Sequence, residues 1–195
     1  RERALFASET ARQKFSEHAQ CLALLADVVT GEEAERCFKA LVESPDLARG
    51  TIYYKHYLFS AYFKFGRADL FFRNLDFWRN CREWGLSTIL ENPWPDSRSD
   101  CHGWGAHPLW HLHTGVAGVQ SAAPWYETCL VAPQPAHLKF IRSKTPTPKG
   151  NVVLDLRFEG GRAIGTVTLP DGLTGAFRWR GAESPLKSGV NAIGR

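Results

Sequence analysis

The sequence predicts a multidomain chain, α first and then β, that ends in a small antiparallel β-sandwich. Two observations support this fold class. In the first 120 residues apolar side chains recur every three or four positions, as on one face of a helix. From Val152 onward they recur at every second position, as on one face of a strand. The change of period predicts two domains, residues 1–120 and residues 121–195.

Four helices are expected in the first domain. The first follows a stripe of apolar residues: Phe15, Ala19, Leu22, Ala26 and Val29. A short second helix begins at Glu32 and is broken at residues 44–46, which contain a proline. A third ends at Gly66, and a fourth runs from Ala68 to a stop at Gly85. The loops between them are short, so consecutive helices should pair as antiparallel hairpins.

The second domain should contain a clear β-hairpin. Residues 152–158 alternate between apolar and polar, a Gly-Gly turn follows, and residues 163–169 are rich in β-branched side chains. Strand-like segments also occur near residues 125–132 and 137–142, and alternation resumes around Phe177. Together these segments are enough for a small antiparallel sandwich.

Charge and hydropathy exclude two classes of partner. The chain has 24 Lys and Arg residues and 20 Asp and Glu residues, which gives a net charge of +4. The basic excess is spread through the strand-like segments and forms no long run, so nucleic acid is not an expected partner. An apolar stretch approaching the roughly 20 residues of a membrane helix does not occur, so no membrane span is expected.

Three further features concern the type of chain. The five cysteines form no C-x-x-C pair, which argues against a disulfide framework and against a zinc ribbon. The sequence contains no Met, even at position 1, and the segment from Tyr53 to Phe59 is apolar on several sides. Both features favour the interpretation that this chain is a segment of a larger helical assembly. The compartment and the oligomeric state stay open.

The loop at residues 85–108 breaks the helical pattern and contains candidate functional residues. It combines the carboxylate of Glu91, the imidazole of His102 and the indoles of Trp94 and Trp104 with several Gly and Pro residues. Aromatic faces next to charged groups suit sugars, whose C–H faces stack on rings and whose hydroxyls form hydrogen bonds. Loops on a rigid scaffold often hold binding residues.

Five short motifs occur along the chain in this order: Ser-Glu-His-Ala-Gln (16–20), Thr-Ile-Tyr-Tyr-Lys-His-Tyr (51–57), Gly-Leu-Ser-Thr-Ile-Leu-Glu (85–91), Arg-Ser-Asp-Cys-His-Gly-Trp-Gly-Ala (98–106) and Thr-Pro-Thr-Pro-Lys-Gly (145–150). This series resembles one family, the bacterial α-L-rhamnosidases of glycoside hydrolase family 78. The resemblance covers nearly the whole chain and matches the C-terminal part of the family. The Ser-Asp-Cys-His-Gly-Trp cluster is its most specific piece.

The resemblance implies a fold and a reaction. The fold is an (α/α)6 toroid of six helical hairpins followed by a β-sandwich, of which this chain would supply the last hairpins and the sandwich. The reaction is hydrolysis of terminal α-L-rhamnosides with inversion, by one carboxylic acid and one carboxylate base. Glu91 matches the general base and His102 matches a histidine that contacts rhamnose, while the general acid lies upstream of residue 1. No cofactor is implied, and the expected ligand is a rhamnose-containing glycoside.

The sequence departs from the family pattern at three positions. Leu90 stands where an aromatic residue is frequent, and Gly103 and Gly105 stand where Ala and Ser are common. These changes concern the shape of the sugar subsite, whereas the general base is retained.

Each candidate residue also has a structural interpretation. Glu91 could be a solvated loop acid or a helix cap, and His102 could be a histidine held by hydrogen bonds within the loop. Trp94 and Trp104 could cover the ends of helical hairpins. Asp96 and Asp100 are the nearby alternatives for a second carboxylate.

Two further groups of side chains lie near this loop or in its neighbouring helices, and two rival functions stay open. The spacing of His107, His111 and His113 superficially suggests a metal site, but no H-E-x-x-H motif is present, so no metal is expected. Tyr53, Tyr54 and Tyr57 are interpreted as part of the helical core. The rival functions are another six-hairpin glycosidase and a non-catalytic carbohydrate-binding or interaction fragment.

Overall fold

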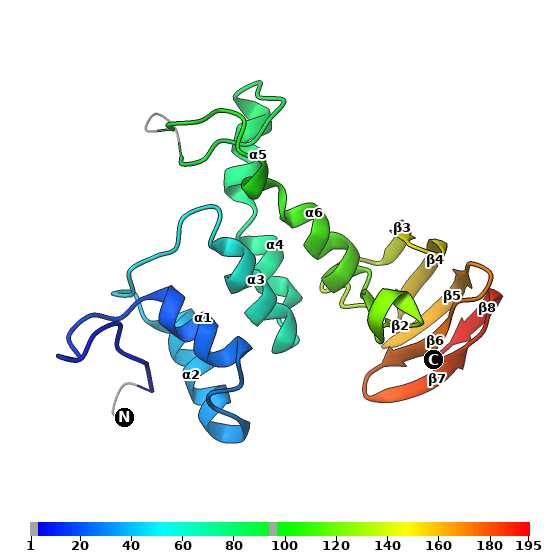
Figure 1. The fold of residues 1–195 in the computed structure, drawn as a ribbon. Coiled ribbons are helices and arrows are strands. Elements are labelled where there is room, and N and C mark those ends of the chain that lie inside the picture. The colour runs from blue at the N-terminus through cyan, green and yellow to red at the C-terminus, as the bar shows by residue number, and fades with distance from the viewer. Residues whose placement is uncertain (1–3, 94–96) are drawn as a thin grey trace. The chain divides into compact units, whose positions relative to one another are not determined.

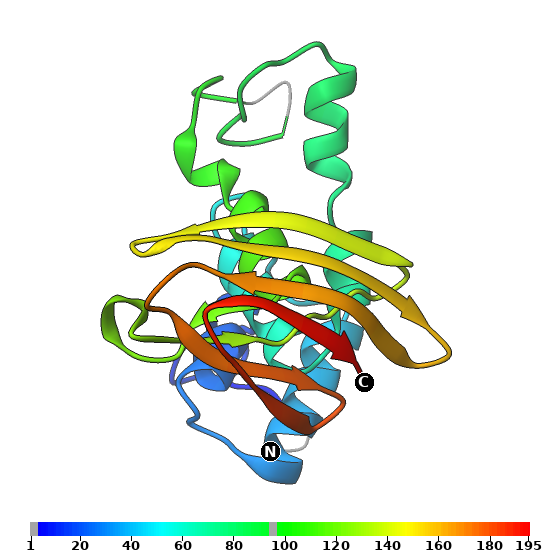
Figure 2. The same cartoon turned by 90° about the vertical axis from the view of Figure 1, so that its right-hand side faces the viewer.

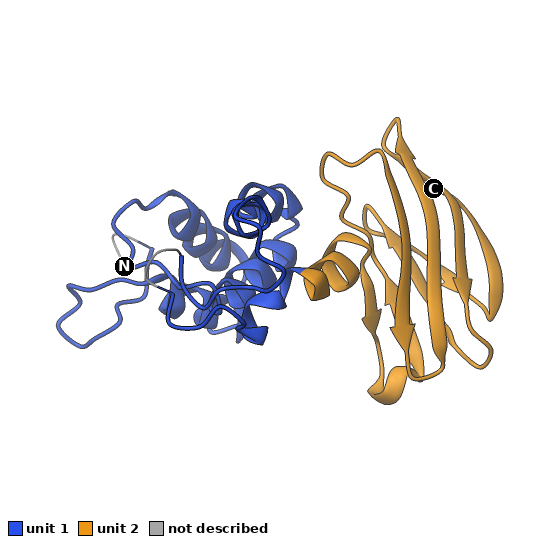
Figure 3. Cartoon of the chain, turned by 90° about the horizontal axis from the view of Figure 1, so that it is seen from above, with its two compact units in different colours: residues 1–108 blue, residues 109–195 orange. Residues whose placement is uncertain are grey.

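The computed structural model of the chain describes residues 4–93 and 97–195. The chain divides into two compact units, Arg1–Pro108 and Leu109–Arg195, which are coloured separately in Figure 3. The first unit is built from helices and loops and the second mainly from strands, so the predicted order, α and then β, is confirmed. The division lies at the start of helix α6 (Pro108–His111), earlier in the chain than the predicted domain boundary. That boundary, as the limit between a catalytic domain and a sandwich, stays a prediction.

The described residues of the first unit form five α-helices, and α1 contacts both α2 and α3 (Figure 1). They are α1 (Glu17–Leu25), α2 (Gly31–Glu43), α3 (Lys55–Lys64), α4 (Ala68–Arg73) and α5 (Asp76–Glu83). The predicted stops at Gly66 and Gly85 are confirmed. Both glycines lie just past a helix end with positive φ values of 67° and 77°, a conformation that residues with a Cβ rarely adopt.

The face of α1 that is buried differs from the predicted stripe. Leu22 of that stripe is 52% exposed, whereas the polar residues Glu17 and Gln20 are buried. Gln20 tolerates burial because its side-chain amide accepts a hydrogen bond from the backbone N–H of Phe6, at 2.7 Å, and donates one to the Phe6 carbonyl, at 2.8 Å. The apolar spacing predicted the helix correctly but was wrong about its buried face, because hydrogen bonding decides which polar groups can be buried.

The predicted fourth helix is wrong as a single element. It is interrupted between α4 and α5 at Asn74, whose side-chain amide donates a hydrogen bond to the carbonyl of Leu70 at 2.9 Å. Asn competes with the regular backbone pattern through such local bonds, which favour turns over helix interiors. The apolar periodicity continues across this turn, so it could not locate the break.

Two four-stranded sheets form most of the second unit, after the short helix α6 and the π-helix η2 (Leu112–Val116). The strands are β1 (Val119–Ser121), β2 (Thr128–Val131), β3 (Phe140–Thr147), β4 (Gly150–Glu159), β5 (Arg162–Leu169), β6 (Thr174–Trp179), β7 (Ala182–Leu186) and β8 (Gly189–Gly194). One sheet has the order β1-β2-β6-β7 and the other β3-β4-β5-β8. Figure 2 shows the second of these sheets, in yellow, orange and red.

The predicted hairpin is formed by β4 and β5, which pair antiparallel across a turn at residues 160–161. Alternate residues of β4 are fully or almost fully buried: Val152, Leu154 and Leu156. They share the core with Phe177 of β6, which is also fully buried. The two-residue period thus predicted both the strand and its buried face.

One strand pairing contradicts the prediction of an antiparallel sandwich. Strand β2 pairs with β6 in parallel, with Thr128 opposite Thr174, while the other pairings among the described strands are antiparallel. The strands β3 to β5 belong to the other sheet and separate β2 from β6 in the sequence. When the chain returns to the first sheet it runs in the same direction as β2. Local patterns do not encode such a distant pairing.

In the described parts of the chain, each helix is too short or too polar to cross a membrane.

Candidate active site

The loop that contains Glu91 is held closed at its base by hydrogen bonds. The backbone N–H of Glu91 donates to the carbonyl of Ser99 at 2.9 Å, and the N–H of His102 donates to the carbonyl of Ile89 at 2.7 Å. Next to Glu91 in the sequence, the side chain of Leu90 is fully buried and anchors this arm of the loop. The backbone therefore fixes Glu91 and His102 on two neighbouring arms.

The side chain of Glu91 forms a two-point ion pair with Arg98. Arg98 Nε lies 3.0 Å from Oε2 of Glu91, and Arg98 Nη2 lies 2.6 Å from Oε1. The Glu91 side chain is 19% exposed and the Arg98 side chain 81% exposed. Hydrogen bonding to the Glu91 carboxylate raises the pKa of Arg98. The carboxylate thus has a defined orientation and stays within reach of solvent.

His102 and Trp104 lie beside two tyrosines, and we refer to Tyr53, Tyr57, His102 and Trp104 as the aromatic cluster. The ring of Trp104 is 5.8 Å from that of His102 and 4.9 Å from that of Tyr53, measured between centroids. The hydroxyls of Tyr53 and Tyr57 are 3.5 Å apart. Trp104 is 67% exposed and Tyr53 is 40% exposed. Exposed rings next to hydrogen-bonding groups could contact a sugar.

The interpretation of Tyr53 as a core residue is wrong, because its side chain is exposed and contacts Trp104. Tyr53 lies in the turn before α3, in which its neighbour Ile52 is the residue that is buried. The apolar periodicity of α3 does not extend to Tyr53, and this could have indicated that Tyr53 is exposed. The neighbouring tyrosines obscured this signal, because tyrosine is common both in cores and on binding surfaces.

The 3-10 helix η1 (Gly103–Ala106), which contains Trp104, is linked to α5, and His107 just after it is linked to the segment before α3. The indole N–H of Trp78 in α5 donates a hydrogen bond to the carbonyl of Gly105 at 2.6 Å. The Nε2 atom of His107 lies 3.0 Å from the carbonyl oxygen of Ile52, just before α3. Burial lowers the pKa of His107 to about 4, so this imidazole is neutral near pH 7.

Gly105 packs tightly against the side chain of Ile89. A Cβ atom at this position would overlap the Cγ2 methyl of Ile89 and approach the Ile89 Cβ to 3.3 Å. At Gly103, two residues earlier in η1, a Cβ would meet nothing within 4 Å. The departure from the family pattern at Gly105 therefore has a steric reason in this chain, whereas the structure does not explain Gly103.

We expect Gly105→Ala to lower the free energy of unfolding by about 1–3 kcal/mol, because the added methyl overpacks the contact with Ile89. Gly103→Ala is the matched control and should change it by less than about 0.5 kcal/mol. Urea denaturation of both variants checks this prediction. Equal stabilities for the two variants would show that the contact with Ile89 is not tight.

The buried carboxylate of Glu17 holds the segment that leads to Tyr53. It accepts hydrogen bonds from the backbone N–H of Gly50 at 2.7 Å, from Arg49 at 2.9 Å and from Lys55 at 3.1 Å. Burial acts to raise the pKa of Glu17, but the Gly50 N–H and the two cations outweigh it, so the pKa lies below its ordinary value. Glu17 belongs to the Ser-Glu-His-Ala-Gln motif, but its residue type and position did not indicate this role.

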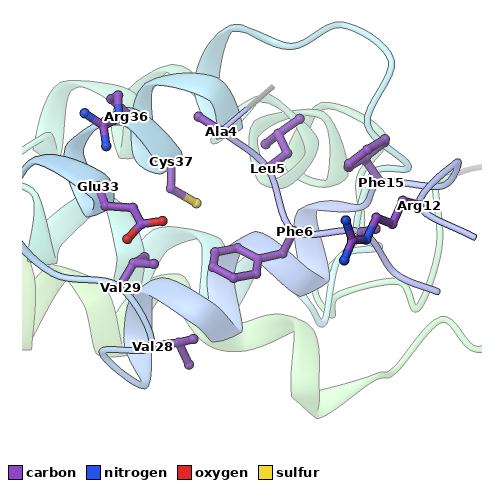
Figure 4. Close-up of a pocket in the computed structure, with 11 residues that line it drawn as sticks. Ala4, Leu5, Phe6, Arg12, Phe15, Val28, Val29, Glu33, Arg36 and Cys37 are labelled. Carbon is purple, nitrogen blue, oxygen red and sulfur yellow. The ribbon is translucent and has the colours of Figure 1, made fainter. Parts of the chain in front are cut away.

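A cavity of about 1030 Å³ lies elsewhere in the first unit, between the N-terminal segment, the turn that follows α1, and helix α2 (Figure 4). Its walls include Phe6, Phe15, Val29, Arg36 and Cys37. None of the described candidate site residues lines it. The cavity is therefore separate from the loop that contains Glu91.

The remaining candidates are placed as follows. Trp94 and Asp96 lie outside the described residues. Asp100 is exposed, and its backbone carbonyl accepts a hydrogen bond from the hydroxyl of Thr88. In the second unit, His113 Nδ1 lies 2.8 Å from the hydroxyl of Thr145. Glu91, His102 and Trp104 thus share one loop, while Asp100 contributes to it through its backbone.

Comparison with known proteins gives matches at the level of three-dimensional structure. The crystal structure of a GH78 family rhamnosidase of Bacillus sp. GL1 matches with a TM-score of 0.75 and 23% sequence identity over 85% of this chain. The native α-L-rhamnosidase of Aspergillus terreus matches with a TM-score of 0.77 and 20% identity over 92% of this chain. The chain has the fold of part of an α-L-rhamnosidase.

A third solved structure, the Streptomyces avermitilis α-L-rhamnosidase complexed with L-rhamnose, matches with a TM-score of 0.76 and 18% identity over 92% of this chain. The chain covers only 19%, 24% and 21% of these three rhamnosidases, in the order given. The sequence matches no family model and no curated protein. The resemblance to family 78 rhamnosidases predicted from the motifs is thus confirmed at the level of the fold.

Proposed function

We propose that the chain is the C-terminal part of an inverting α-L-rhamnosidase that releases terminal α-L-rhamnose from glycosides. In this proposal, residues 1–120 complete an (α/α)6 toroid of helical hairpins and residues 121–195 form the sandwich that follows it. The observation that carries the proposal is the match of up to 92% of this chain to solved α-L-rhamnosidases with TM-scores from 0.75 to 0.77.

The proposed role of Glu91 is that of the general base. Its carboxylate takes a proton from water while the water oxygen forms a bond to the anomeric carbon of rhamnose. The bond from that carbon to the leaving oxygen breaks, and a carboxylic acid from another part of the protein protonates the leaving oxygen. In inverting glycosidases the two carboxyl groups stand roughly 6.5–9.5 Å apart, which leaves room for the water.

The proposed role of the aromatic cluster is to bind the sugar. His102 would form a hydrogen bond with a rhamnose hydroxyl, and Trp104 would stack against a face of the ring, with Trp94 as a further candidate. The exposure of Trp104, 67%, and the 5.8 Å separation of its ring from that of His102 support this assignment. The reaction requires no cofactor.

The test is release of L-rhamnose from an aryl α-L-rhamnoside by protein expressed from the complete open reading frame. Release of rhamnose, with no release from the corresponding aryl β-D-glucoside, supports the proposal. Release of a different sugar would favour another six-hairpin glycosidase. Binding of rhamnosides without hydrolysis would favour a carbohydrate-binding protein.

A further inference from the structure

The contact between Arg98 and Glu91 has a geometry that orients a carboxylate. Two different nitrogens of the guanidinium, Nε and Nη2, each meet a different carboxylate oxygen, at 3.0 Å and 2.6 Å. A planar guanidinium that makes two parallel contacts fixes the plane of the carboxylate. The terminal torsion of a glutamate is otherwise broad, so a single contact would leave this plane free to rotate.

The pair with Arg98 leaves acceptor positions on the carboxylate of Glu91. Each carboxylate oxygen has two acceptor positions, and Arg98 uses one on each oxygen. As far as the described residues go, a second position on each oxygen is thus left for water. Among residues 4–93 and 97–195, Arg98 is the only cationic side chain that forms an ion pair with Glu91.

The exposure of Arg98 argues against a role as an internal structural support. Its side chain is 81% exposed, and its ion pair joins two residues that are seven positions apart in the sequence. The base of this loop is closed independently by the hydrogen bond from the Glu91 N–H to the Ser99 carbonyl at 2.9 Å. The backbone therefore does not need Arg98 to close the loop, whereas the Glu91 carboxylate needs it to keep its orientation.

We propose that Arg98 is a positioning residue that holds the carboxylate of Glu91 toward the attacking water. This inference rests on the proposed function of Glu91 as general base. Arg98 takes up no proton: the proton passes from water to Glu91, and the guanidinium stays charged throughout.

The test compares Arg98→Ala and Arg98→Lys in protein expressed from the complete open reading frame, with an aryl α-L-rhamnoside as substrate. Arg98→Ala should lower kcat by about 10- to 100-fold, the scale expected for a misplaced catalytic group, with little change in KM. Arg98→Lys should recover only part of this loss, because an ammonium group cannot form the two-point contact. Added guanidinium ion should partly restore kcat in Arg98→Ala.

Arg79→Ala is the matched control for folding and for the loss of a surface ion pair. Arg79 is a half-exposed arginine of α5 that pairs with Asp76 at 2.7 Å. This variant should keep wild-type kcat, and circular dichroism should show that all variants are folded. Glu91→Gln should not respond to guanidinium, because the carboxylate itself is missing.

The outcomes separate this inference from the proposed function. If the wild-type protein hydrolyses the rhamnoside and Glu91→Gln does not, the proposed function stands, and unchanged kcat in Arg98→Ala then overturns the role of Arg98 alone. A rise in kcat in Arg98→Ala also overturns it, because Arg98 would then obstruct the base. If the wild-type protein does not hydrolyse the rhamnoside, the proposed function fails and the inference fails with it.

Discussion

Glu91→Gln is expected to lower kcat on an aryl α-L-rhamnoside by at least about 100-fold, because a general base contributes about 10²- to 10⁴-fold. The amide has the size of the carboxylate and can still hold the attacking water by a hydrogen bond, but it cannot accept a proton near neutral pH. Substrate binding should therefore change little, and KM should stay close to that of the wild-type protein. Steady-state kinetics on protein from the complete open reading frame measures both quantities.

The matched control is Glu83→Gln, which removes an exposed carboxylate from α5 and should leave kcat unchanged. Near-normal kcat in Glu91→Gln would remove Glu91 from the reaction. Asp96 and Asp100 would then be the next carboxylates to test.

Glu17→Ala is expected to lower the free energy of unfolding by about 3–5 kcal/mol, because it leaves partly buried cations and the N–H of Gly50 without their acceptor. The Glu17 side chain is 2% exposed, whereas that of Glu32 in α2 is 96% exposed. Glu32→Ala is therefore the matched control and should cost less than about 1 kcal/mol. Urea denaturation at pH 7 measures both variants.

The stabilisation from Glu17 should also depend on pH. The pKa of Glu17 is lower in the folded chain than its ordinary value of about 4.3, so the unfolded chain binds the proton more readily. The difference in stability between wild type and Glu17→Ala should be fully present above that ordinary value. It should shrink as the pH falls through the lower folded-state pKa. A difference that does not change with pH would show that Glu17 acts through packing and not through its charge.

The sequence predicted the elements whose local pattern determines them. The alternation in residues 152–169 predicted the β4–β5 hairpin because one face of each strand is buried. The glycines at residues 66 and 85 predicted helix ends because each adopts a positive φ. In each case a few neighbouring residues contain the necessary information.

Other features depend on contacts between distant residues and could not be predicted in this way. The parallel pairing of β2 with β6 depends on where the chain returns after three strands of another sheet. The burial of Glu17 depends on Gly50 and Lys55, more than thirty residues later in the sequence. An acidic residue near the start of a helix is usually exposed to solvent, so the sequence alone does not indicate that Glu17 is buried.

The candidate site likewise contains some features that the sequence indicated and others that depend on the folded structure. The composition of the loop and the family motifs indicated Glu91, His102 and Trp104. The motifs contained Arg98 and Tyr53 as well, but their roles depend on geometry: the two-point contact of Arg98 with Glu91, and the ring of Tyr53 beside that of Trp104. The identity of a side chain does not reveal which neighbour it orients.

The most direct test of the proposed function is the anomeric form of the sugar that is first released. Protein expressed from the complete open reading frame is mixed with an aryl α-L-rhamnoside, and the anomeric proton is followed by NMR before mutarotation equilibrates the product. An inverting reaction requires that β-L-rhamnose accumulates first, because water enters on the side opposite the leaving group. Initial release of α-L-rhamnose, or the absence of rhamnose, would contradict the assignment of this chain to an inverting α-L-rhamnosidase with Glu91 as its base.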